Sequence, residues 1–124
     1  MIFSLRSMDK HFVLSLFHLL IIVPFFLYVG VYRASTHPWV YKALMIVGVI
    51  LLLFHGSKLA ARLSARSDYA YINAIHVLFA PLLIYIGYHQ QDTPRAAYEV
   101  LLMITFAAFG YHLFSLVRIL QIQE

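Results

Sequence analysis

The sequence predicts an all-α protein, a bundle of four transmembrane helices that run up-down-up-down through the bilayer. Of its 124 residues 63% are hydrophobic and only 11% are charged, which is too apolar for a soluble domain of this size. Four apolar runs reach the length of about 20 residues that a helix needs to cross a membrane. These runs cover roughly residues 11–32, 41–63, 69–89 and 96–120. We expect residues 1–124 to form a single integral membrane domain in the lipid bilayer.

An internal repeat is the second observation behind this fold. Equivalent residues recur 57 positions apart, and in both copies a tyrosine precedes a histidine by fourteen residues. The equivalent residues are Tyr41 and Tyr98, His55 and His112, Pro24 and Pro81, and Gly30 and Gly87. We therefore expect two tandem helical hairpins, repeat 1 at about 11–63 and repeat 2 at about 69–120, joined by a linker at 64–68. Parallel repeats of this kind imply a pseudo-twofold axis along the membrane normal.

The first apolar run is predicted to be a retained helix. It is longer than the apolar part of a cleaved signal peptide, and no small-x-small cleavage site precedes Tyr32. Pro24 removes one backbone hydrogen bond, so we expect a kink there.

Short loops join the helices within each predicted repeat, so the two helices of a hairpin should pack antiparallel. Pro38 and Pro94, each close behind a threonine, are typical of the first turn of a helix and predict where the second and fourth helices begin. The connection between the repeats is charged and rich in small residues. Ser67 or Asp68 in it is expected to cap the third helix.

The distribution of cations predicts that both termini are cytoplasmic. Six cationic residues lie on the side of the termini and the middle connection, against three on the side of the two other loops. The six are Arg6, Lys10, Lys58, Arg62, Arg66 and Arg118, and the three are Arg33, Lys42 and Arg95. The cations are not interleaved with aromatic residues as in a nucleic-acid site, so no nucleic-acid partner is expected.

Each predicted helix carries one histidine away from its ends, namely His18, His55, His76 and His112. In each helix about fourteen residues separate the histidine from the outer end, which corresponds to about 21 Å. The four imidazoles are therefore expected to form one layer in the inner part of the hydrocarbon region. Ionisable residues at membrane depth are usually functional. Neutral histidines can also simply hydrogen-bond across helices as packing residues.

The two pairs of histidines do not repeat equally well. His55 and His112 keep the offset of 57 residues, whereas His18 and His76 are 58 apart. One residue turns an α-helix by about 100°. Either the proline kink absorbs the difference, or only one of His18 and His76 fully faces the axis.

The leading functional prediction is bis-histidine ligation of a b-type haem, for electron transfer. His55 and His112 would hold the iron, because in the predicted topology they face each other across the axis. Small residues on the same faces would leave space for a flat group, although they would also suit close helix packing. The small residues are Gly48, Thr105 and Ala108, and the polar residues expected to support the ligands are Ser15, Lys58, Asn73 and Ser115. The arrangement is similar to that of membrane-anchored b-type cytochromes, without a motif of any one family.

Other functions remain open at this point. His18 and His76 would be left for haem substituents, a quinone or proton transfer. Alternatively, His18, His55, His76 and His112 together would bind a transition metal ion or relay protons. A third possibility is a scaffold or accessory subunit of a larger membrane complex, with no cofactor. The absence of cysteine excludes thiolate metal sites, and no carboxylate lies at the depth of the histidines to support a di-iron site or hydrolysis.

Overall fold

The computed structural model describes residues 2–123, and the side chains of residues 10–121. The described chain is entirely helical and contains four helices that are long and apolar enough to cross a membrane. These are Lys10–Ser35, Pro38–Ser64, Ala70–Asp92 and Arg95–Gln121. The four helices predicted from the sequence are therefore confirmed, with bounds close to the expected ones.

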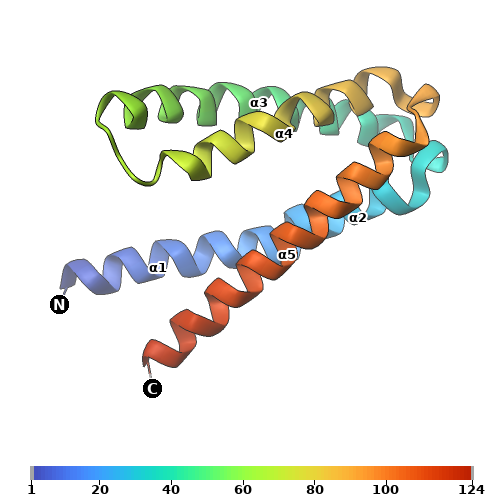
Figure 1. Ribbon diagram of the computed structural model, residues 1–124. Coiled ribbons are helices and arrows are strands. Elements are labelled where there is room, and N and C mark those ends of the chain that lie inside the picture. The colour runs from blue at the N-terminus through green and yellow to red at the C-terminus, as the bar shows by residue number, and fades with distance from the viewer. Residues whose placement is uncertain (1, 124) are drawn as a thin grey trace. The chain divides into compact units, whose positions relative to one another are not determined.

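The elements follow one another along the chain as shown in Figure 1. The first span consists of α1 (Ile2–Phe17), a π-helical turn η1 (His18–Ile22), α2 (Val23–Tyr32) and a short 3-10 turn η2 (Arg33–Ser35). The others are α3 (Pro38–Ser64), α4 (Ala70–His89) with its 3-10 turn η3 (Gln90–Asp92), and α5 (Arg95–Gln123). The π turn ends two residues before Pro24, where the sequence predicts only a kink.

The start of α3 shows why the helices begin where they do. Pro38 occupies the first turn, where its missing N–H is not needed. His37 caps this end, since its Nδ1 accepts a hydrogen bond from the backbone N–H of Trp39 at 3.4 Å. His37 is thus the N-capping residue of α3.

The chain divides into two compact units. One unit contains the chain up to Val31 together with the chain from Glu99 onward, and the other contains Tyr32–Tyr98. The first will be called the terminal unit and the second the central unit. Each combines one helix from each predicted repeat, so the compact units do not coincide with the repeats.

In the central unit α3 and α4 pack side by side as an antiparallel hairpin (Figure 1). Gly87 lies against Tyr41 and Met45, while Gly48, further along α3, lies against Ile84, earlier in α4. Residues later in α3 thus contact residues earlier in α4, as in any antiparallel pair of helices. The fully buried side chains of this unit include Tyr41, Leu44, Leu83 and Ile86.

In the terminal unit the first span packs against α5 in the same antiparallel sense. Gly30 lies against Leu102, and His18 lies against His112, one end of each helix meeting the opposite end of the other. Val29 and Leu101 are fully buried. The contact of Gly30 with Leu102 is equivalent, at an offset of 57 residues, to the contact of Gly87 with Met45.

Two tyrosines contact the 3-10 turns η2 and η3 of the central unit. The Tyr41 hydroxyl donates to the carbonyl oxygen of Arg33 at 2.5 Å, and the Tyr98 hydroxyl donates to that of Gln90 at 3.0 Å. The two hydroxyl oxygens are 2.7 Å apart. Arg33 and Gln90 also share a positive φ, 51° and 50°, so the two turns repeat each other's backbone conformation.

Candidate functional site: two stacked histidine pairs

The central unit holds one pair of stacked imidazoles. The rings of His55 on α3 and His76 on α4 have centroids 4.1 Å apart and planes inclined by 12°. Both side chains are partly buried. The antiparallel packing of the hairpin sets this contact, because it places the C-terminal part of α3 beside the N-terminal part of α4.

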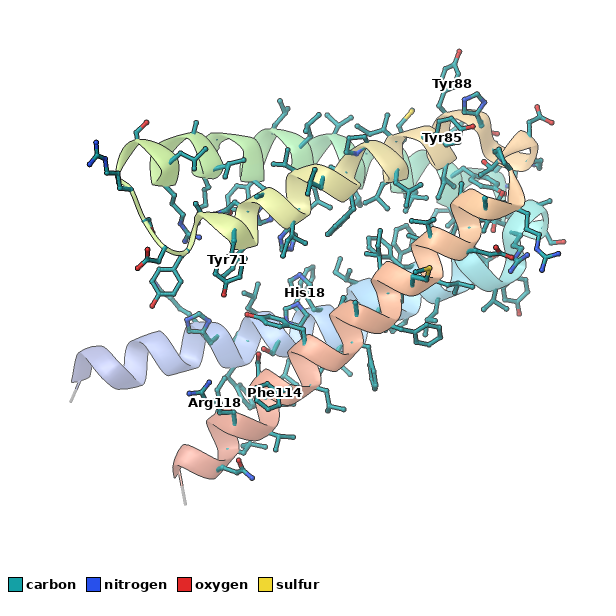
Figure 2. All side chains as sticks on the ribbon, in the orientation of Figure 1. His18, Tyr71, Tyr85, Tyr88, Phe114 and Arg118 are labelled. Atoms are coloured by element: carbon teal, nitrogen blue, oxygen red, sulfur yellow. The ribbon has the colours of Figure 1, made fainter. Side chains whose placement is uncertain are left out.

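The terminal unit holds a second pair of the same geometry. The rings of His18 and His112 on α5 also have centroids 4.1 Å apart, with planes inclined by 18°. His112 is buried and His18, labelled in Figure 2, is partly buried. All four predicted histidines therefore take part in ring contacts, and each unit brings together one histidine from each predicted repeat.

Hydrogen bonds of Nδ1 indicate the tautomer of three of the four histidines. Nδ1 of His18 donates to the carbonyl oxygen of Leu14 at 2.8 Å, and Nδ1 of His76 donates to that of Ile72 at 2.6 Å. A carbonyl oxygen only accepts, so Nδ1 carries the hydrogen and the lone pair of the neutral ring lies on Nε2. Nδ1 of His55 is 2.9 Å from the side-chain oxygen of Asn73, which favours the same tautomer.

The side-chain amide of Asn73, which contacts His55, contains a buried donor that is not satisfied by any described residue. Its side chain is only 2% exposed, and its oxygen is the partner of His55. Its Nδ2 has no hydrogen-bond partner among the residues that the structure describes. A buried amide donor without a partner is costly, so this position is suited to the acceptor atom of a bound group or a water molecule.

The predicted pairing of His55 with His112 takes one histidine from each unit and stays a prediction. Within a unit the neighbour of His55 is His76, and the neighbour of His112 is His18. Rings stacked at 4.1 Å leave no layer between them for a macrocycle. Neither stacked pair, as it stands, fits the two axial ligands of one haem iron.

Gly48 does not provide the space that the sequence predicts beside the imidazoles. A side chain at this position would meet Ile84 Cγ1 at 2.8 Å and the Ala80 carbonyl oxygen at 3.1 Å. α4 fills the place, so Gly48 allows close helix packing in the central unit. Close helix packing is one of the two roles that the sequence leaves open for Gly48, and its expected contact with a cofactor stays a prediction.

The other two small residues lie on α5. Thr105 is fully buried, and its hydroxyl donates to the carbonyl oxygen of Leu101 at 2.7 Å, so its polarity is satisfied within its own helix. Ala108 is partly buried. Their proposed contact with a cofactor stays a prediction.

The expected supporting residues have different environments. Asn73 contacts His55 directly, as described above, and Ser15 is buried at 3% exposure in the first span. Ser115 is partly buried. Lys58 is exposed and its Nζ lies 4.9 Å from the centre of the Phe54 ring, a cation–π contact. Its predicted contact with a haem propionate stays a prediction.

The contact of His55 with His76 was missed from the sequence, although a signal for it is present. A short linker joins α3 to α4, so residues at similar distances on either side of it must lie side by side. His55 precedes the end of α3 by nine residues, and His76 follows the start of α4 by six. These similar distances predict that the two histidines are neighbours.

Within the described part of the chain, no three or more histidine, aspartate or glutamate side chains come together in a group that could hold a metal ion. No protein-family model matches the sequence, and neither the curated proteins nor the solved structures yield a significant match.

Proposed function

We propose that this protein is a small membrane haemoprotein in which His55 and His112 ligate a b-type haem for electron transfer. The observation that carries the proposal is the hydrogen bond of His55 Nδ1 to the side-chain oxygen of Asn73, which leaves the lone pair of the neutral ring on Nε2. Metal-ligating histidines usually donate their other ring N–H to a carbonyl or carboxylate in this way, which fixes the tautomer and the ring orientation.

The donor set of the chain suits this group. The four histidines lie on predicted membrane spans, and the chain has no cysteine that would offer thiolate ligands instead. Since neither stacked pair fits one iron, the two axial ligands would come from different units. His55 and His112 are favoured because they alone keep the offset of 57 residues. A bound haem would supply one-electron redox chemistry.

The remaining residues of the site would act on the ligands. His76 and His18, each stacked on a ligand, would restrict the ring orientation of His55 and His112. Asn73 would hold the Nδ1 hydrogen of His55 and offer its Nδ2 to a hydrogen-bond acceptor of the bound group. A quinone is the class of redox partner that would reach such a site from the bilayer.

The arrangement of the helices in the membrane forms part of the same proposal. We propose that the chain is a tandem repeat with a pseudo-twofold axis along the membrane normal, and that both termini are cytoplasmic. In such a repeat the first span is equivalent to α4, and α3 is equivalent to α5. The His55–His76 pair is therefore equivalent to the His112–His18 pair. The near-identical stacking of these pairs supports the repeat.

The test is the absorbance spectrum of the full chain purified in detergent and titrated with haem. The wild type is expected to show a Soret band with low-spin features. His55→Ala and His112→Ala should abolish the low-spin features, because each removes one axial ligand. His18→Ala and His76→Ala should retain most of them, and Trp39→Phe, on the exposed outer end of α3, is a matched control.

Two other results would replace this proposal. Binding of a transition metal without a Soret band, weakened by all four histidine substitutions, would favour the metal site over haem. A chain that binds neither haem nor metal would favour a scaffold or accessory subunit, or proton transfer by the histidines.

A further inference from the structure

The first span contains one residue more than α4 between its histidine and its proline. His18 lies six residues before Pro24, whereas His76 lies five residues before Pro81. In an uninterrupted α-helix this extra residue would rotate His18 by about 100° relative to the rest of the span. His18 would then lie on a different face from the one that His76 occupies on α4.

The geometry shows no such rotation. His18 and His76 each stack on a histidine at 4.1 Å, and each Nδ1 donates to the carbonyl four residues earlier. Three residues before each histidine lies a buried polar residue, Ser15 and Asn73. In the part that precedes the prolines, the first span and α4 are therefore equivalent at an offset of 58 residues.

Beyond the prolines the equivalence has an offset of 57 residues. Gly30 packs on Leu102 as Gly87 packs on Met45, and each pair is related to the other by this number. The register between the two spans thus changes by one residue between the histidine and the glycine.

The change coincides with η1. This turn covers His18–Ile22, and the backbone N–H of Val23 donates to the carbonyl oxygen of His18, five residues earlier. A π-helical bond encloses one residue more than the α-helical bond between residues four apart. We propose that η1 is a positioning device, which absorbs the extra residue and so presents His18 to His112 as α4 presents His76 to His55.

This proposal concerns the placement of His18 and does not depend on what the histidines bind. It predicts that the two spans respond in opposite ways to a change of length. Leu20 and Leu78 are suitable sites, because they are equivalent at the offset of 58 residues and are exposed by 70% and 79%. Deletion of Leu20 should convert η1 into α-helix and keep His18 in place. Insertion of a leucine after Leu78 should create a matching π turn and keep His76 in place.

The opposite changes should displace the histidines. Insertion of a leucine after Leu20 adds a second extra residue to the first span, so His18 should rotate by about 100°. Deletion of Leu78 leaves α4 one residue short, so His76 should rotate by about 100°. The two tolerated and the two disruptive changes are matched in position, residue type and exposure.

Cross-linking in the full chain tests this pattern, since the protein has no cysteine of its own. His18→Cys with His112→Cys reports on the terminal unit, and His55→Cys with His76→Cys reports on the central unit. A short bis-thiol reagent is applied in detergent, and the cross-linked peptides are measured by mass spectrometry. The tolerated changes should keep the yield within about twofold, and the disruptive ones should lower it about tenfold, because the rotated side chain lies on another face.

The same response of both spans to deletion, or the loss of cross-linking in all four variants, would overturn the proposal. General unfolding falls under the second result, since the proposal requires two of the variants to fold. Cross-linking involves no haem, so the absence of a Soret band in the spectrum and a failure of this inference remain distinguishable.

Discussion

At the scale of single residues, the absence of a side chain at Gly87 lets α4 approach α3 closely. A Cβ at this position would lie 2.6 Å from Met45 Cβ and 2.7 Å from the carbonyl oxygen of Tyr41. The carbonyl belongs to the backbone of α3, so the two helices would have to move apart. We expect Gly87→Ala to lower the free energy of unfolding by about 1–3 kcal/mol. Thermal unfolding in detergent measures the change.

Two other glycines serve as controls for this prediction. A Cβ at Gly56, also on α3, would have no neighbouring atom within 4 Å, so Gly56→Ala should be neutral or stabilise the helix by about 0.5–1 kcal/mol. Gly30 faces the end of the Leu102 side chain, which can move, so Gly30→Ala should cost less than Gly87→Ala. Equal unfolding temperatures for the Gly87 and Gly56 variants would contradict the close approach of α4.

At the scale of elements, Tyr41 and Tyr98 connect the turns η2 and η3. Their hydroxyls approach each other and the carbonyl oxygens of Arg33 and Gln90, and both residues are buried. Tyr41→Phe removes one hydroxyl and leaves the partly buried carbonyl of Arg33 with one partner fewer. The expected cost is about 1–2 kcal/mol of unfolding free energy, measured by thermal unfolding.

A double-substitution cycle separates the contact between the tyrosines from their contacts with the turns. Because the two hydroxyl oxygens lie 2.7 Å apart and their two hydrogens serve three contacts, the cost of Tyr41→Phe with Tyr98→Phe should be less than the sum of the two single costs. Tyr71→Phe is the control, since Tyr71 is 57% exposed and should change stability by less than about 0.5 kcal/mol. Strict additivity would show that the hydroxyl pair contributes nothing of its own.

At the scale of the whole molecule, the cation distribution predicts which ends of the helices face the cytoplasm. A reporter fused after Glu124 should be active in the cytoplasm, and reporters inserted at Ser35 or Gln91 should be active on the opposite side. The physical reason is the retention of cationic segments on the cytoplasmic side during insertion, six cations against three here. Cytoplasmic activity of either loop reporter would contradict the topology and the inner position of the histidines.

The sequence alone determined the number, limits and character of the helices. Apolar length and composition suffice for this, because every span must bury about 20 apolar residues whatever its neighbours are. The repeat of proline, glycine, tyrosine and histidine positions was likewise readable, and it located the four histidines. The haem, the repeat symmetry and the orientation in the membrane remain proposals that these residues support.

Only the tertiary structure decided that neighbouring histidines stack, because stacking depends on the distance between the helices and on the rotation of each helix about its axis. Hydropathy does not contain either quantity. The extra residue before Pro24 left the face of His18 open, and the hydrogen bond from Val23 to His18 within η1 resolves it. In the same way, the sequence leaves open whether Gly48 borders a bound group or a neighbouring helix. In the structure α4 packs against Gly48, and this depends on the positions of both helices.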